Sequence, residues 1–139
     1  MREILFKAKR IYDGKWIEGY YLRDQYHTGG KDIIFYRKDS DRFTVYTNII
    51  DIETLCQFTG LCDKNGKKIW ENDILMAHLD ESYPEDVTNE TVEWNVAGWV
   101  AHETGSTDGE YIDKFDLEHY EVVGNVFDSP ELLQEESDE

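Results

Sequence analysis

The sequence contains a series of short β-prone runs separated by turn residues. Near the start, Phe6 and Ala8 alternate with lysines, and the pair Asp13-Gly14 divides this run from residues 16–22. Alternation with a period of two puts apolar side chains on one face of a strand, and an Asp-Gly pair favours a tight hairpin. Many short strands with frequent turns predict a mainly β domain, most simply a small barrel closed on itself.

The same pattern continues along the chain and predicts further strands at residues 32–37, 43–47, 69–76 and 120–127. Residues 91–100 predict either one strand with a bulge at Gly98 or a hairpin. A helical turn is expected after Asp51, which can cap it, and should end near Gly60. A second turn is expected at residues 131–133. Residues 79–90, with a proline and several acids, predict an exposed loop, and a second polar loop follows at residues 102–110.

The stretch LCDKNGKKIWENDIL, residues 61–75, can be interpreted as a calcium loop or as a hairpin. A calcium loop of the EF-hand type needs glycine at its sixth position and glutamate at its twelfth. Counted from Asp63, those positions hold lysine and isoleucine, so the pattern fails. Asn65-Gly66 between two apolar runs instead predicts a type I′ turn, in which both central residues have positive φ.

Three blocks resemble the YopX family of proteins encoded by bacteriophages and prophages. They are MREILFKAKRIYDGKWIEGYYL at residues 1–22, TGLCDKNGKKIWENDIL at 59–75 and EVVGNVFDSPELL at 121–133. Where the family pattern has glycine in the central block, this chain has Asn72. Because asparagine tolerates positive φ better than most residues, we expect Asn72 to keep a left-handed backbone conformation.

The resemblance implies a β-rich fold with an SH3-like, partly open barrel, to which the sequence adds hairpin extensions and one or two short helical turns. It implies no biochemical activity and supplies no catalytic residue. A length of 139 residues with 40% hydrophobic content fits one core. We therefore expect a single YopX-like domain at residues 1–133, followed by a disordered acidic tail at 134–139.

Charge is divided unevenly along the chain. Residues 1–70 hold 13 Lys+Arg and 10 Asp+Glu, whereas residues 71–139 hold one base, Lys114, and 21 acids. A net charge of −20 in the second half argues against direct binding of double-stranded DNA, because phosphate binding requires a cationic surface. A protein partner of that half should be basic or neutral. The alternative is that the acids form a solvated face that only keeps the protein soluble.

Cellular location is inferred from what the sequence lacks. It has no apolar run of about eighteen residues and no signal-peptide pattern, so we expect a cytoplasmic protein of the bacterial host with no membrane association. Cys56 and Cys62 form no zinc-binding pattern and are expected to be small apolar side chains near the core of a protein in a reducing compartment.

The sequence contains no motif that points to an active site, and we expect no catalytic, cofactor-binding or metal-binding residues and no enzymatic activity. Glu71 and Asp73 could form a paired acid, but beside Asn72 they are more consistent with caps of a turn. The four histidines, His27, His78, His102 and His119, occur singly and do not predict a metal cluster.

Two functions remain open. The first is a non-catalytic phage accessory protein that binds a protein through its acidic C-terminal half, in one version by mimicking DNA. The second is a single-stranded nucleic-acid-binding or processing protein that uses the basic N-terminal strands. Its candidate residues are Lys7, Lys9, Arg10, Lys15, Trp16, Tyr20, Tyr21, Trp70, Trp94 and Trp99. A head-to-tail homo-oligomer, joining the basic half of one copy to the acidic half of another, is a further alternative.

Overall fold

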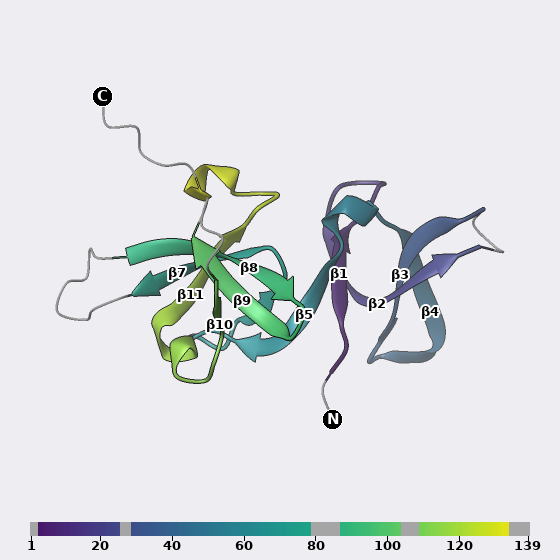
Figure 1. The fold of residues 1–139 in the computed structure, drawn as a ribbon. Helices are drawn as coiled ribbons and strands as arrows, with labels where there is room; N and C mark the ends of the chain where they lie inside the picture. The colour runs from purple at the N-terminus through teal and green to yellow at the C-terminus, as the bar shows by residue number, and fades with distance from the viewer. Residues whose placement is uncertain (1–2, 26–28, 79–86, 104–108, 134–139) are drawn as a thin grey trace. The chain divides into compact units, whose positions relative to one another are not determined.

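The computed structural model describes residues 3–25, 29–78, 87–103 and 109–133. Within these residues the chain forms eleven β-strands and three short 3₁₀ turns (Figure 1). The prediction of a mainly β protein is therefore confirmed. The chain divides into two compact units, Met1–Phe58 and Thr59–Glu139. No helix in the described ranges is long and apolar enough to cross a membrane.

The first unit is a meander of antiparallel strands. The strands are β1 (Phe6–Lys9), β2 (Trp16–Asp24), β3 (Lys31–Lys38), β4 (Asp41–Ile49) and the start of β5 (Cys56–Cys62). They lie in the order β4-β3-β2-β1-β5, so all neighbours except β1 and β5 are also consecutive in sequence. This arrangement follows from the hairpin signals between the runs.

The end of β4 returns to the end of β1 and curls this sheet. Arg10 and Ile50 form an isolated antiparallel bridge, and the N–H of Ile11 donates to the carbonyl of Ile49 at 3.0 Å. The curl encloses a small core in which Ala8, Ile34 and Ile50 are buried. The described strands nevertheless form two antiparallel sheets and no closed barrel, which corrects the simplest expectation of a barrel closed on itself.

The second unit contains the other sheet. Its strands are β7 (Asp73–His78), β8 (Val87–Asn95), β9 (Gly98–Glu103), β10 (Glu110–Tyr111) and β11 (Tyr120–Asn125), in the order β10-β9-β8-β7-β11. The last strand returns over a long distance in sequence, pairing Val122 with Leu75. The end of β5 lies beside β6 (Lys68–Trp70). The core consists of Ile69, Leu75, Ala77, Val92, Trp99, Ala101, Tyr120 and Val122.

The turn at Asn65-Gly66 exists, but its predicted type was wrong. Gly66 has φ of 80°, whereas Asn65 has no positive φ. The N–H of Gly66 donates to the carbonyl of Asp63, and the N–H of Asp63 donates to the carbonyl of Lys67. This is the pattern of a type I turn followed by one left-handed glycine, a common three-residue hairpin connection. Asp63 favours it, because its Oδ1 accepts from the N–H groups of Asn65 and Lys67, both at 2.9 Å.

The left-handed conformation predicted for Asn72 is confirmed, with φ of 67°. Among the described residues it is the single non-glycine residue with positive φ. It lies between β6 and β7, where its N–H donates to the carbonyl of Val92 and its carbonyl accepts from Val126. These two contacts bring three distant segments of the second unit together.

Several boundaries differ from the expected ones. Gly98 begins β9 opposite Asn95 and is not a bulge, whereas the register of β11 shifts between Val122 and Gly124. The part of the expected 79–90 loop from Val87 onward belongs to β8, and so does not form a loop; residues 79–86 lie outside the described residues. Likewise, β9 extends through Glu103, into the loop expected at residues 102–110.

The predicted helical turns occur as 3₁₀ turns. The first, η1 (Ile52–Thr54), is capped by Asp51, whose Oδ1 accepts from the N–H of Glu53 at 3.1 Å. It ends at Leu55, earlier than expected, because β5 begins at once. The turn near the C-terminus is η3 (Pro130–Leu133), and η2 (Asp116–His119) was not anticipated. The expected disordered tail at 134–139 lies outside the described residues, and the single domain at 1–133 remains a prediction.

Candidate acidic pocket

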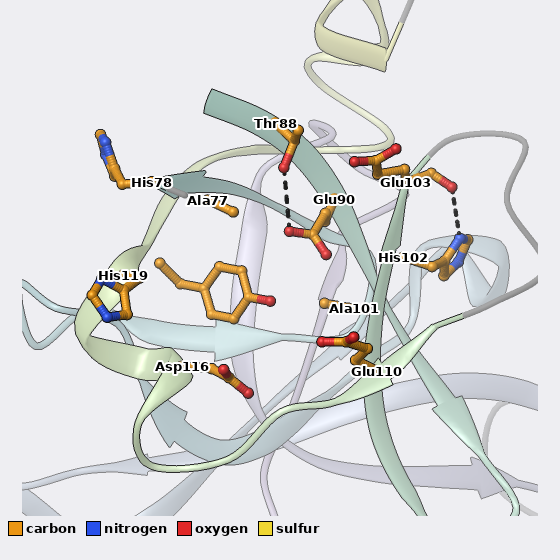
Figure 2. Close-up of a pocket in the computed structure, with 11 residues that line it drawn as sticks. Ala77, His78, Thr88, Glu90, Ala101, His102, Glu103, Glu110, Asp116 and His119 are labelled. Carbon is orange, nitrogen blue, oxygen red and sulfur yellow. Dashed lines mark hydrogen bonds between the residues drawn. The ribbon is translucent and has the colours of Figure 1, made fainter. Parts of the chain in front are cut away.

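A pocket of about 430 Å³ opens on the second unit (Figure 2). Its lining residues come from β7, β8, β9, β10, η2 and β11, so it is built from most of that sheet. They are Ala77, His78, Thr88, Glu90, Ala101, His102, Glu103, Glu110, Asp116, His119 and Tyr120. Four of these are acids and three are histidines, which makes the pocket strongly polar.

Strand pairing explains why a carboxylate stands here. Glu90 lies opposite Leu75 on β7 and opposite Glu103 on β9, and cross-strand partners share a face of the sheet. Leu75 is fully buried, so Glu90 occupies a position on the core side of β8, two residues before the buried Val92. The small side chains of Ala77 and Ala101 leave space next to it. Figure 2 shows Glu90 between these two alanines.

The electrostatic environment of Glu90 opposes its ionisation. Burial raises the pKa of Glu90, and the nearby carboxylates of Glu103 and Glu110 raise it further. Within the described ranges, Glu90 accepts one side-chain hydrogen bond, from the hydroxyl of Thr88, and it is long, at 3.5 Å. Burial likewise raises the pKa of Tyr120, with added repulsion from Glu90 and Asp116, so this phenol stays protonated.

Three cationic or titratable groups of the second unit lie next to acids outside the pocket. His102 Nε2 lies 3.0 Å from an oxygen of Glu93, and Lys64 and His78 approach Glu121 at 3.8 and 3.9 Å. Burial lowers the pKa of His102, but Glu93, the backbone contact with Glu103 and the charge of Glu90 together outweigh burial and raise the pKa. No ion pair in the described parts of the chain involves Glu90, Glu103, Glu110 or Asp116. The pocket therefore carries negative charge that these residues do not neutralise.

The histidines were expected to be dispersed, and three of the four are not. His78, His102 and His119 line the same pocket, while His27 falls outside the described residues. Among the residues that the structure describes, no group of three or more His, Cys, Asp or Glu side chains is arranged to hold a metal ion. The pocket thus gathers potential ligands without converging them on one point.

Glu71 and Asp73, the candidate acid pair, lie outside the pocket. Asp73 is 2% exposed, and its Oδ2 accepts a hydrogen bond from the N–H of Trp70 at 2.8 Å. This is the turn-capping role that the sequence favoured for such residues. A carboxylate buried in that way is not positioned to act on a substrate.

The basic and aromatic candidates of the first unit are only partly brought together. Lys7 and Lys9 place their Nζ atoms 4.7 and 5.5 Å from the ring centre of Trp16. Arg10 is instead bound to Asp13. The exposed Tyr20 pairs with the ring of Phe35.

The remaining candidates do not extend this group. The hydroxyl of Tyr21 donates to Asp32 at 2.6 Å, and Lys15 is exposed. Trp70, Trp94 and Trp99 belong to the second unit, where Trp70 and Trp99 are buried. The expected patch of four bases with six aromatics is thus reduced to two lysines and one tryptophan.

Comparison with known proteins supports the fold. The family model described as YopX protein matches residues 5–134, nearly the whole chain. No curated protein matches the sequence. A solved structure, "Crystal structure of protein EF1440 from Enterococcus faecalis", is similar with a TM-score of 0.61 and 21% identity, covering 96% of this chain and 100% of the other. At that identity the likeness shows a shared fold.

Proposed function

The chain belongs to the YopX protein family, and on that basis we propose that it is a phage or prophage accessory protein that binds another protein and performs no catalysis. It acts in the cytoplasm of the bacterial host. The binding surface is the acidic second unit, and the partner presents a basic group to it.

The observation that carries this proposal is the uncompensated charge of the acidic pocket. Residues 59–139 hold 4 Lys+Arg and 22 Asp+Glu, a net charge of −18. Most such acids can be explained as solvated surface, but Glu90 is a carboxylate on the core side of a sheet with its pKa raised. Burial and the nearby acids disfavour the ionised form of Glu90. A cation that binds beside this carboxylate stabilises the ionised form. Mimicry of DNA is one form of such binding, in which the carboxylates occupy a basic groove.

The test is an affinity capture from host lysate with three versions of the full chain. One is the wild type, and a second carries Glu90→Gln, Glu110→Gln and Asp116→Asn. The third, Glu3→Gln, Glu18→Gln and Glu53→Gln, changes the net charge equally, at exposed positions of the first unit. A basic protein retained by the wild type and the control, but lost by the pocket variant, is the expected result. Equal retention by all three would contradict the proposal.

A second candidate function is favoured by one observation, the two lysines beside Trp16. Lysine ammonium groups next to an aromatic ring are the elements with which proteins bind single-stranded nucleic acid. A gel shift with single-stranded DNA or RNA near ~50 mM salt, lost on Lys7→Gln with Lys9→Gln, would support it. Absence of any shift at that salt concentration would remove it.

A further inference from the structure

We propose that the acidic pocket is a binding site for one guanidinium group, such as an arginine side chain. This inference rests on the proposed function and specifies the chemical group that the pocket recognises. It is argued from the hydroxyl of Tyr120 and from the acids that line the pocket with it.

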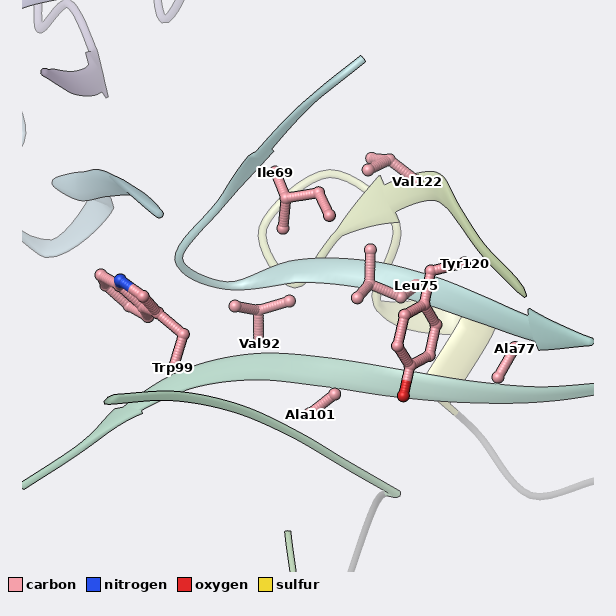
Figure 3. Packing of buried hydrophobic residues seen from close by; sticks show 8 residues of the cluster. All are labelled: Ile69, Leu75, Ala77, Val92, Trp99, Ala101, Tyr120 and Val122. Atoms are coloured by element: carbon pink, nitrogen blue, oxygen red, sulfur yellow. The ribbon is translucent and has the colours of Figure 1, made fainter. Parts of the chain in front are cut away.

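Tyr120 supplies the observation that is independent of the acids. It is 8% exposed, and its ring packs in the core beside Leu75 and Ala77 (Figure 3). The same residue lines the pocket. Within the described residues its hydroxyl has no hydrogen-bond partner, although its pKa responds to Glu90 and Asp116. A phenol so deeply packed, near carboxylates that form no described ion pair, offers a hydrogen-bond acceptor that a ligand can satisfy.

The excess of acids around this hydroxyl favours a cation as the ligand. Glu90, Glu110 and Asp116 face the pocket and form no described ion pair. An anionic ligand would add to their repulsion, and a neutral one would leave it unchanged. A cation instead gains Coulomb energy from all three carboxylates, in a partly buried site where screening by water is reduced.

The absence of a converging ligand group among the described residues favours guanidinium over a metal ion or an ammonium. The described His, Asp and Glu side chains do not converge on a point that could hold a metal. An ammonium is also a compact charge and needs acceptors close around it. A guanidinium is planar and spreads five N–H donors over a wider fork, so it can reach separate acceptors such as Glu90 and the Tyr120 hydroxyl. A volume of about 430 Å³ is large enough for such a side chain.

The test uses two-dimensional NMR titration of the full chain with N-acetyl-arginine methylamide. The lysine and citrulline counterparts serve as comparisons, because citrulline has the same shape as arginine and no charge. We expect saturable shifts for arginine at the amides of Glu90, Ala101 and Tyr120, weaker shifts for lysine and none for citrulline. Equal binding of citrulline, shifts that map elsewhere, or no shifts at tens of millimolar ligand would overturn the proposal.

Two variants separate this site from a general charge effect. Glu90→Gln removes the carboxylate with little change of shape, and Tyr120→Phe removes the hydroxyl that has no partner, so both should fold. Each should weaken arginine binding by about tenfold, the loss expected for one hydrogen bond to a charged group. Glu131→Gln, an exposed acid on η3, should have no effect. Unchanged affinity in both pocket variants would refute the assignment.

A second titration, with the peptide acetyl-Gly-Arg-Gly-amide, distinguishes an arginine carried by a protein from a small guanidinium ligand. Tighter binding of the peptide than of the free arginine derivative indicates an arginine carried by a protein. Binding of the free derivative alone indicates a small guanidinium ligand. If arginine binds while no basic protein is captured, the guanidinium site stands and the proposed function fails. If a basic protein is captured and arginine does not bind, the proposed function stands and the guanidinium site fails.

Discussion

The carboxylate of Asp63 accepts a hydrogen bond from the backbone N–H of Val122, with a distance of 2.9 Å across 59 positions of sequence. Asp63 is 6% exposed and also accepts from the N–H groups of Asn65 and Lys67. The side chain of Asp63 therefore stabilises the turn and also binds the backbone of β11. Burial opposes ionisation of this carboxyl, but the three N–H groups outweigh burial and lower its pKa.

Replacing Asp63 with alanine should destabilise the second unit. The change leaves buried N–H donors without an acceptor, which should cost roughly 2–3 kcal/mol in the free energy of unfolding. Because the folded-state pKa lies below the ordinary value of 3.8, this contribution is present above that pH and is lost as the pH falls through the folded-state value. Urea unfolding at pH 7 and near pH 3 measures both effects. An unchanged urea midpoint at pH 7 would show that the carboxylate is not needed.

Asn72 provides a test of backbone strain. Asn72 has φ of 67°. Asn72→Ala should lower the free energy of unfolding by about 1 kcal/mol, whereas Asn72→Gly should be neutral or slightly stabilising. Asn65→Ala is the matched control, because Asn65 is exposed and has no positive φ. Thermal unfolding of the three variants is sufficient. Equal losses for alanine and glycine at Asn72 would mean that the side chain, not the backbone, matters there.

Gly124 lies against Ser129, and this contact leaves no room for a side chain. A Cβ at Gly124 would lie 2.5 Å from the hydroxyl oxygen of Ser129 and 2.7 Å from its Cβ. Gly124→Ala should therefore destabilise the protein by roughly 1–3 kcal/mol through overpacking. Adding Ser129→Gly removes both atoms and should recover part of the loss. A double variant that is no more stable than the sum of the single effects would argue against this clash.

The pH dependence of stability should reveal Glu90. A carboxyl whose folded-state pKa is raised binds its proton more tightly in the folded protein than in the unfolded chain. Its ionisation therefore lowers stability as the pH rises from the ordinary value of 4.5 through the folded-state pKa. Glu90→Gln should melt at a higher temperature than the wild type above this range and at a similar temperature below it. Melting curves from pH 4 to 8 that run parallel for the two proteins would exclude this effect.

Turns and backbone conformations that are set by residues adjacent in the sequence could be predicted from it. Hairpins followed from Asp-Gly and Asn-Gly pairs, and the left-handed conformation of Asn72 followed from the resemblance to a family with glycine there. The type of the Asn65-Gly66 turn could not be predicted from the pair alone. It depends on Asp63, whose side chain binds two N–H groups of the turn and favours a type I geometry.

The pocket could not be predicted, because its walls are distant in sequence. His78, His102 and His119 lie near the ends of different elements, and the pairing of β8 with β7 and β9 and of β11 with β7 brings them together. A weak signal existed at Glu90, which alternates with Val92 and Trp94 and so falls on the apolar face of a strand. The neighbouring acids and proline outweigh that alternation and predict a loop at Glu90.

The pairing of β11 with β7 also determines when the acidic unit can be completed during synthesis. Strands β7 to β10 pair with strands that are adjacent in the sequence. The pairing of Leu75 on β7 with Val122 on β11 can form only after β11 has been synthesised. Such distant contacts form late, because a long loop must close before they are gained. On the ribosome, β7 therefore exposes an unpaired edge until nearly the whole chain has been made. Acidic side chains close to an open strand edge disfavour its pairing with a second copy of the same chain.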